Sequence, residues 1–388
     1  MSQSTLTVYG VDLLGELLMV TMLICNVWRL RESSHESRLL RMLVACAMLG
    51  CMLDSVFATC ENAPGALARG LLVGSGTILY AAATITCSCW ALFITLHMYG
   101  LVTPLRRRLL LAPAIVCLAL IVGNLLSPLV FNIDAENVYT RLPLARVLTG
   151  IYYGYFCYAL ALEAHMRKST AGLRFFPGWA LIFPVAVGGS VQILFPPLPL
   201  FWATVSVGIA GTITSLQNED IYRDRLTGLY NRAFLEYLKN KDGGKTGVEM
   251  TGVMIDLNGF KSINDRFGHA MGDQALVDVA HTLRRAVGDI GVTVRYAGDE
   301  FVILLNTRDG AVVKRTMTAI RQSFSLFNVD VKRPYQLSAS MGQYPLAPGS
   351  HSIEEFIETI DRAMYEDKRR YYQEHPEANR RAEGSHRI

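Results

Sequence analysis

The sequence has few charged residues for its length. Lys, Arg, Asp and Glu make up only 18% of its 388 residues, whereas 51% are hydrophobic, and the mean hydropathy is +0.27. This balance excludes an ordinary soluble protein of this size. The scarcity is uneven, because long apolar segments fill residues 8–216 and a normally charged sequence follows. The sequence therefore predicts a membrane module at 1–216, a linker helix at 217–223 and a soluble domain of ordinary single-domain size from 224 onward.

Cysteine is missing from the predicted soluble domain. All eight cysteines lie between Cys25 and Cys157, mostly within apolar segments, where cysteine acts as a small apolar residue. Cys87 and Cys89 are too closely spaced and too isolated to indicate a metal site. We therefore assign the cysteines to packing. The net charge of +4 is accounted for by arginines that flank the apolar segments, so it indicates no nucleic-acid partner.

The apolar region predicts an all-α membrane bundle of about seven spans, each near the length of about twenty residues that a bilayer requires. The predicted spans are 10–30, 39–59, 70–99, 109–130, 144–165, 175–194 and 198–216. The last two are joined only by Phe195-Pro-Pro-Leu-Pro199, so six spans with one broken element are also compatible with the sequence.

The loop arginines orient this bundle. They gather around the first, third and fifth loops, at Arg29–Arg41, Arg106–Arg108 and Arg167–Arg174. By the positive-inside rule, we expect the N-terminus outside and the soluble domain in the cytoplasm, which requires an odd number of spans. The first segment lacks a basic N-terminal region and a small-residue cleavage site, so we do not expect a cleaved signal peptide.

One acid interrupts the second predicted span. Asp54 lies deep in an otherwise apolar segment, and acids inside membranes face the bundle interior and often mark function. Two interpretations stay open, a ligand- or proton-sensing group and a packed polar contact. The stimulus of such a module cannot be identified from the sequence.

In the soluble domain, the segment Arg295-Tyr-Ala-Gly-Asp-Glu-Phe301 places two acids after two small residues. Apolar runs at 292–294 and 301–305 flank it as strands do, so a tight β-hairpin with Asp299 and Glu300 at its tip is predicted. Little side-chain bulk stands before these carboxylates, so they can approach a phosphate chain and a hard cation. An ordinary surface hairpin with Gly-Asp turn chemistry is the alternative.

A further acid, Asp256, is the last residue of the predicted strand 247–256. Active sites of α/β domains lie at this end of a strand, although a role as a helix cap is also compatible with the sequence. Helices are expected from 232 and at 274–287, 311–326 and 353–372, with a further strand at 336–342. The order predicts an α+β fold, a sheet with antiparallel strands backed by helices. If the first strand neighbours the hairpin, Asp256 and Asp299 converge into a two-carboxylate site for a phosphate-bound divalent cation.

Several further blocks of residues occur in one order across 224–373. They are Asp224-x-Leu-Thr-Gly-Leu-x-Asn-Arg232, Asp256-x-x-x-Phe-Lys-x-Ile-Asn-Asp265, Gly268-His269, Gly272-Asp273, Arg295-x-x-Gly-Asp-Glu-Phe301, Ser340-Met-Gly342 and Asp361-x-Ala-Met-Tyr-x-x-Lys368. In these blocks the domain resembles the GGDEF family of diguanylate cyclases, which has a nucleotidyl-cyclase-like palm fold. The resemblance does not extend to residues 1–216, whose architecture alone is similar to bacterial sensor modules, or to 374–388, which we expect to be a polar, disordered tail.

The resemblance implies a reaction in which two GTP molecules give cyclic di-GMP and two pyrophosphates, on two domains that face each other in a homodimer. It implies Mg²⁺ or Mn²⁺ held by Asp256, the Leu257 carbonyl, Asp299 and Glu300. Asp299 or Glu300 would help deprotonate the attacking hydroxyl, and Lys261 would offset phosphate charge.

The resemblance also implies the substrate-binding residues. Asn264 and Asp273 would read the guanine edge. Phe260, His269 and Gly298 would shape the nucleotide pocket, and Lys368 would reach the phosphates. A solvated surface position for Lys261 and a structural cap for His269 are the alternatives.

The sequence departs from the family pattern at four places. Ala297 replaces the first glycine of the signature, and Asn258 replaces a second acid after Asp256. The inhibitory product site falls on Gly288-Asp-Ile-Gly291, without its charges, so feedback inhibition through it is not expected. Arg369-Arg-Tyr-Tyr-Gln373 stands where Gly-Arg-Asn is expected, and Arg369 or Arg370 is the candidate to replace the arginine of that pattern. We therefore expect a signal-regulated, membrane-anchored cyclase, with a catalytically silent module that binds GTP or a partner as the alternative.

Overall fold

The computed structural model describes residues 3–25, 34–169, 179–195, 199–241, 250–288, 290–329, 333–346 and 353–375. The chain divides into two compact units, Met1–His165 with Phe176–Gln217 and Met166–Phe175 with Asn218–Ile388. The predicted tail lies almost wholly outside the described residues.

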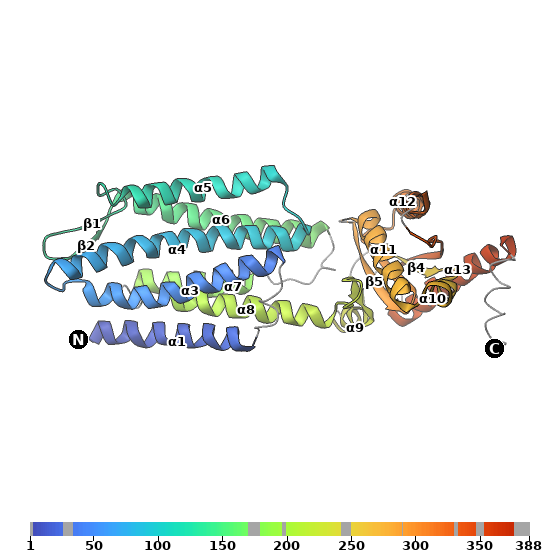
Figure 1. Ribbon diagram of the computed structural model, residues 1–388, viewed down its shortest axis with the longest axis horizontal. Coiled ribbons are helices and arrows are strands. Elements are labelled where there is room, and N and C mark those ends of the chain that lie inside the picture. The colour runs from blue at the N-terminus through green and yellow to red at the C-terminus, as the bar shows by residue number, and fades with distance from the viewer. Residues whose placement is uncertain are drawn as a thin grey trace. The chain divides into compact units, whose positions relative to one another are not determined.

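The N-terminal unit is a bundle of helices that run side by side (Figure 1). Its described helices are α1 (Gln3–Cys25), α3 (His35–Cys60), α4 (Ala66–Tyr99), α5 (Pro104–Gly123), α6 (Pro143–Ser169), α7 (Trp179–Leu194) and α8 (Phe201–Ile221). A short antiparallel hairpin that the sequence did not predict, β1 (Phe131–Ile133) and β2 (Tyr139–Arg141), joins α5 to α6.

A helix lies at each of the seven predicted spans, but the structure supports membrane crossing for fewer of them. Among the described residues, three helices are long and apolar enough to cross a membrane by length and composition: the α1 segment Thr5–Cys25, α3 and α4. These three helices suggest a membrane-anchored protein. A count of seven spans, and their orientation, stay predictions.

The C-terminal unit is an α+β domain, as predicted. Its elements are β3 (Tyr230–Asn231), α9 (Arg232–Lys241), β4 (Met250–Leu257), α10 (Phe260–Phe267), α11 (His269–Val287), β5 (Gly291–Ala297), β6 (Glu300–Leu305), α12 (Gly310–Val329), β7 (Ala339–Leu346) and α13 (Ile353–Glu374). The five-stranded sheet has the order β3-β5-β6-β4-β7. β3 pairs with β5 in parallel, and the other neighbours are antiparallel.

Helix α11 begins earlier than the sequence indicated. The expected start was residue 274, but α11 runs from His269. Gly268, with a φ of 82°, separates it from α10, and the glycine-containing segment that follows is helical after all. The break between the two helices is therefore a single residue.

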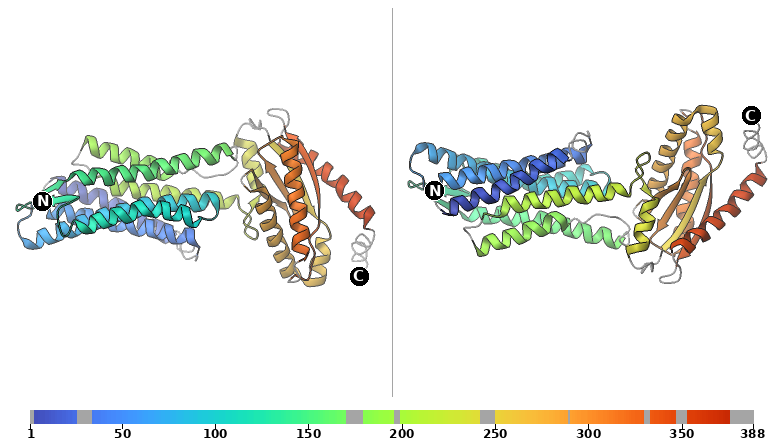
Figure 2. Two further views of the ribbon diagram at one scale, coloured as in Figure 1. Left: turned by 90° about the horizontal axis from the view of Figure 1, so that it is seen from above. Right: turned by 90° about the horizontal axis from the view of Figure 1, so that it is seen from below.

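Helices cover both faces of the sheet (Figure 2). On one face, Val253, Ile255 and Leu257 of β4 pack with apolar residues of α11 and α12. On the other, Met250 and Met254 pack with residues of α9 and α13, such as Phe234 and Met364. Side chains of a strand alternate between its faces, so Asp256 follows Met254 on the α13 face.

The packing of α13 on the sheet depends on a missing side chain. A Cβ on Gly342 of β7 would overlap the backbone of Met364 in α13. In the register of the sheet, Gly342 lies opposite Met254, two residues before Asp256. The close approach of α13 therefore occurs directly beside the end of the strand that carries the acid.

We predict that Gly342→Ala loosens this packing. Backbone atoms must move to admit the methyl group, and overpacking of this kind costs about 1–3 kcal/mol. Hydrogen–deuterium exchange of the full chain should become faster in β7 and α13. Gly310→Ala is the matched control, because a Cβ on Gly310 meets nothing within 4 Å. Equal exchange in the two variants would contradict the prediction.

Candidate active site

The site is built around a buried carboxylate at the end of β4. Asp256 is only 5% exposed, and its Oδ1 accepts a hydrogen bond of 2.7 Å from the Nζ of Lys368. Lys368 lies one helical turn beyond Met364, on the face of α13 that covers the sheet. Burial of an unpaired charge is costly, and the Lys368 ammonium group is the charge that pairs with Asp256.

The β5–β6 hairpin brings the other two acids to the same edge. Glu300 pairs with Asp256 in the register of β6 and β4, and the backbone N–H of Leu257 donates to the carbonyl of Asp299 at 3.3 Å. Gly298 forms the turn with a φ of 39°, which is in the range that favours glycine. The predicted convergence of Asp256, Asp299 and Glu300 is therefore present.

The three acids interact electrostatically. Burial, and then the Asp256 carboxylate, raise the pKa of Asp299. The pKa of Glu300 is raised by burial and by Asp256, Asp299 and Asp361. For Lys368, burial lowers the pKa, but the hydrogen bond and the charge of Asp256 outweigh it, so the net shift is upward. The end of the sheet where these acids meet therefore holds more negative charge than Lys368 alone compensates.

A second ion pair holds the hairpin turn in place. The Nη1 of Arg295 lies 3.1 Å from Asp224 Oδ1, and its Nε donates to the carbonyl of Gly298 at 3.0 Å. Asp224 in turn accepts hydrogen bonds from the N–H and hydroxyl of Thr227, at 2.9 and 2.7 Å. Although burial raises the pKa of Asp224, these bonds and Arg295 lower it overall. Sequence reasoning gave neither residue a role, although both stand in the quoted motifs.

Asn258, which stands where the family pattern has a second acid after Asp256, makes hydrogen bonds of its own. Its Oδ1 accepts from the Ser340 hydroxyl at 2.8 Å, and its Nδ2 donates to Ser338 Oγ at 3.1 Å. Ser340 lies opposite Asp256 in the β4–β7 register. The side-chain amide of Asn258 therefore links the end of β4 to β7, and it acts as both hydrogen-bond donor and acceptor.

The predicted base-reading residues lie on α10 and the first turns of α11. Asn264 packs against Gly272, in space that a Cβ there would fill. Lys261, His269 and Asp273 are exposed, and Phe260 packs partly against the core. Among the described residues, no hydrogen bond or ion pair joins this group to the three acids, and its proposed nucleotide contacts stay predictions.

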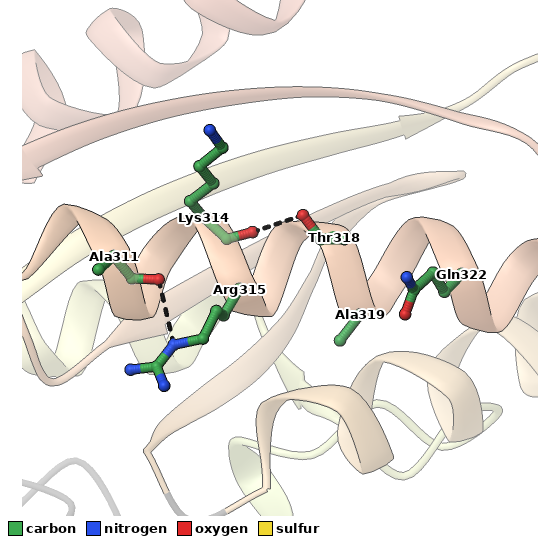
Figure 3. A pocket seen from close by; sticks show the side chains of 6 residues that line it. All are labelled: Ala311, Lys314, Arg315, Thr318, Ala319 and Gln322. Atoms are coloured by element: carbon green, nitrogen blue, oxygen red, sulfur yellow. Dashed lines mark hydrogen bonds between the residues drawn. The ribbon is translucent and has the colours of Figure 1, made fainter.

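The remaining departures lie at the surface or outside the described residues. Ala297 ends β5 and is exposed. Residue 289, in the expected product site, is not described. A surface depression of about 500 Å³ is lined only by α12 residues (Figure 3): Ala311, Lys314, Arg315, Thr318, Ala319 and Gln322. It includes none of the acids, so the geometry around Asp256 indicates the functional site better than this depression does.

The acids offer ligands for a hard cation. Carboxylate and carbonyl oxygens are the donors that Mg²⁺ prefers, and the mutual repulsion of Asp256, Asp299 and Glu300 favours a positive charge between them. Within the described part of the chain, no three acids, histidines or cysteines are grouped closely enough to hold a metal alone. The carboxylates could therefore supply only part of the ligands of a metal, and phosphate and water would have to supply the rest.

Comparison with known proteins identifies the class of this domain. Residues 221–373 match the family model "Diguanylate cyclase, GGDEF domain", and the C-terminal unit is a GGDEF domain. The chain is similar to the "Probable diguanylate cyclase DgcC" of Escherichia coli, with 29% identity over 38% of this chain and 40% of the relative. It is also similar to "Diguanylate cyclase DosC" of Escherichia coli, with 31% identity over 40% of this chain and 35% of the relative.

These similarities concern the GGDEF domain alone. The chain spans about two fifths of the length of these relatives. Among solved structures, the coiled coil and GGDEF domain of DgcB from Caulobacter crescentus, in complex with c-di-GMP, matches with a TM-score of 0.37. The identity is 27%, over 40% of this chain and 85% of that one.

We predict that the hairpin acids destabilise the nucleotide-free domain at neutral pH. When folding raises the pKa of a carboxyl group, the folded domain loses stability as that group ionises. Asp299→Asn and Glu300→Gln should therefore make the domain more stable. Hydrogen exchange in β4 and β6 of the full chain should be slower in both variants. The difference should shrink as the pH falls toward the ordinary carboxyl range, because the native acids then become protonated.

The matched control for these variants is Glu236→Gln, at an exposed position of α9. Slower exchange in the control as well would show a general effect of lowered negative charge. Faster exchange in Asp299→Asn and Glu300→Gln would contradict the prediction.

A third prediction concerns Lys368. In Lys368→Met, Asp256 stays buried without its counter-charge, which costs about 3–5 kcal/mol in fully buried pairs. The Lys368 side chain is 29% exposed, so we expect a smaller loss, about 1–3 kcal/mol. Hydrogen exchange in β4 and β7 should be correspondingly faster, and unchanged in Lys314→Met, an exposed lysine of α12. An additional Asp256→Asn substitution should recover most of the loss.

Proposed function

We propose that this protein is a membrane-anchored diguanylate cyclase that condenses two GTP molecules into cyclic di-GMP and two pyrophosphates. The observation that carries the proposal is the convergence of Asp256, Asp299 and Glu300 at one sheet edge, in a domain that matches the GGDEF family. The similar DosC and DgcC are named diguanylate cyclases, the latter as probable.

The acids would hold Mg²⁺ or Mn²⁺ together with the nucleotide phosphates. Asp256, the Leu257 carbonyl, Asp299 and Glu300 are the ligands that we assign. When bound, the metal would neutralise charge on the phosphates. Lys368 is then free to turn from Asp256 toward a phosphate, because the metal replaces it as the counter-charge.

The carboxylates of the hairpin also suit proton transfer. The raised pKa of Asp299 and of Glu300 makes each a better proton acceptor than an ordinary surface acid. One of them would take the proton of the attacking 3′-hydroxyl, and Lys261 would offset charge that develops on the phosphates.

GTP would be selected by residues beside this edge. Asn264 and Asp273 would read the guanine edge, and Phe260, His269 and Gly298 would border the nucleotide. Each domain would hold one GTP, so the reaction needs a homodimer in which two domains face each other. We assign the domain to the cytoplasm, where GTP is available, and the N-terminal unit to the inner membrane as a regulatory module.

One observation favours a different function. After Lys368 the chain reads Arg369-Arg-Tyr-Tyr-Gln373 where the family pattern has Gly-Arg-Asn, so the phosphate contact of that arginine is lost unless Arg369 or Arg370 replaces it. A domain that binds GTP without turning it over, and signals by its conformation, would have this property.

A turnover assay separates the two functions. The full chain in lipid nanodiscs, supplied with GTP and Mg²⁺, should form cyclic di-GMP and pyrophosphate in a ratio of one to two. Glu300→Gln should lower the rate by about 10²-fold or more, a typical cost of removing one group that stabilises the transition state. GTP binding, measured with a fluorescent analogue, should persist.

The control for the assay is Glu236→Gln, which should retain the full rate. A native chain that binds GTP as a dimer and gives no cyclic di-GMP would overturn the cyclase and support the silent module. Product formation that survives Asp299→Ala with Glu300→Ala would remove the proposed site from the reaction.

A further inference from the structure

Three helices of the N-terminal unit meet around a small polar cluster. A Cβ on Gly15 of α1 would lie 2.8 Å from Cys51 Sγ of α3 and 3.4 Å from Ser206 Oγ of α8. Glycine thus lets α1 approach both helices closely. Asp12 lies one turn before Gly15, in a segment that is apolar and long enough to cross a membrane.

Asp12 is a deeply buried acid with one oxygen unpaired. Its side chain is only 2% exposed. The Ser55 hydroxyl of α3 donates to its Oδ2 at 2.9 Å, but its Oδ1 has no hydrogen-bond partner. A buried acceptor without a donor is costly, so this atom indicates a missing donor or cation.

The groups that face Asp12 supply no positive charge. Asp54 of α3 and Glu16 of α1 interact with it electrostatically, and Cys51 adds a thiol near all three acids. Tyr9, one turn earlier, shares a hydrogen bond with Thr59. Ser206 is the α8 neighbour at Gly15 and does not titrate. Within the described part of the chain, no lysine, arginine or histidine pairs with Asp12 or Asp54.

Asp12 is buried and Asp54 is partly buried, and two neighbouring carboxylates in such surroundings are unfavourable when both are charged. A proton on one of them, or a cation between them, would compensate the charge. A cation needs several oxygen ligands, whereas a proton needs only one carboxylate oxygen, and Asp12 Oδ1 is unpaired. A proton is therefore the better fit.

We propose that Asp12 and Asp54 form a proton-binding site between α1 and α3. The proton resides on Asp12 Oδ1, while Oδ2 keeps its bond to Ser55. One negative charge is thereby removed beside the charge of Asp54, which interacts with Asp12 electrostatically. The site adjoins α8, the last helix before the GGDEF domain. The proton is the signal that this site detects in the proposal.

The proposal can be tested by infrared spectroscopy of the full chain in nanodiscs, with ¹³C-labelled aspartate. A protonated, labelled carboxyl band should be present at neutral pH, disappear as the pH rises, and shift in D₂O. The isotope label separates aspartate from the buried Glu163 and from Glu300. Because this readout needs no GTP, it is independent of the cyclase activity.

Substitutions assign the band. Asp12→Asn should abolish it. Asp54→Asn should make it disappear at a lower pH than in the native chain, because the neighbouring charge is gone. Asp134→Asn, in the β1–β2 loop, is the matched control and should leave the band unchanged, since an amide oxygen can still accept the two N–H bonds that Asp134 accepts.

Three results would overturn the proposal. They are the absence of a labelled band at neutral pH, a band that persists in a folded Asp12→Asn chain, and a band that sodium ions displace at constant pH. The last would identify a metal cation as the ligand. If Asp12→Asn does not fold, the shift in Asp54→Asn decides, and an unshifted band there contradicts a shared site.

Discussion

The GGDEF domain is organised around the need to keep one buried carboxylate charged. Asp256 lies near the C-terminal end of β4, a strand that helices cover on both faces. An uncompensated charge is unfavourable there. Lys368 meets this need only because α13 packs against β7 at Gly342, where no side chain intervenes. The position of a whole helix is therefore tied to one ion pair at the sheet edge.

The same site is left with excess negative charge. Lys368 compensates one acid, but the hairpin brings two more beside it, and their raised pKa values record the excess negative charge. A structure optimised for stability alone would not keep three acids and one lysine together. A bound cation would relieve this excess. In the N-terminal unit, the proton that we propose on Asp12 would have the role that Lys368 has at Asp256.

The sequence placed Asp256 at the end of a strand and Asp299 and Glu300 at the tip of a hairpin, because these signals are local. The predicted convergence of Asp256 and Asp299 was conditional on the pairing of that strand with the hairpin. The structure shows this pairing between β4 and β6, with Asp256 opposite Glu300. The Lys368–Asp256 pair could not be predicted in this way, since 112 residues separate its members and the geometry of α13 sets their distance. Asp12 was missed for a similar reason. Asp54 stands out in its apolar segment, but only the packing of α1 on α3 reveals a pair.

Two departures from the family pattern differ in their structural surroundings. Ala297 lies at an exposed strand end, whereas the left-handed conformation of the turn belongs to Gly298, which is retained. The added methyl group therefore imposes no strain on the turn. Tyr372 is different, because it lies one turn after Lys368 and interacts with its charge. A hydroxyl there can donate one hydrogen bond to a phosphate but adds no positive charge. We therefore expect this end of α13, where Arg369 and Arg370 are the nearby cations, to affect phosphate binding more than the altered hairpin does.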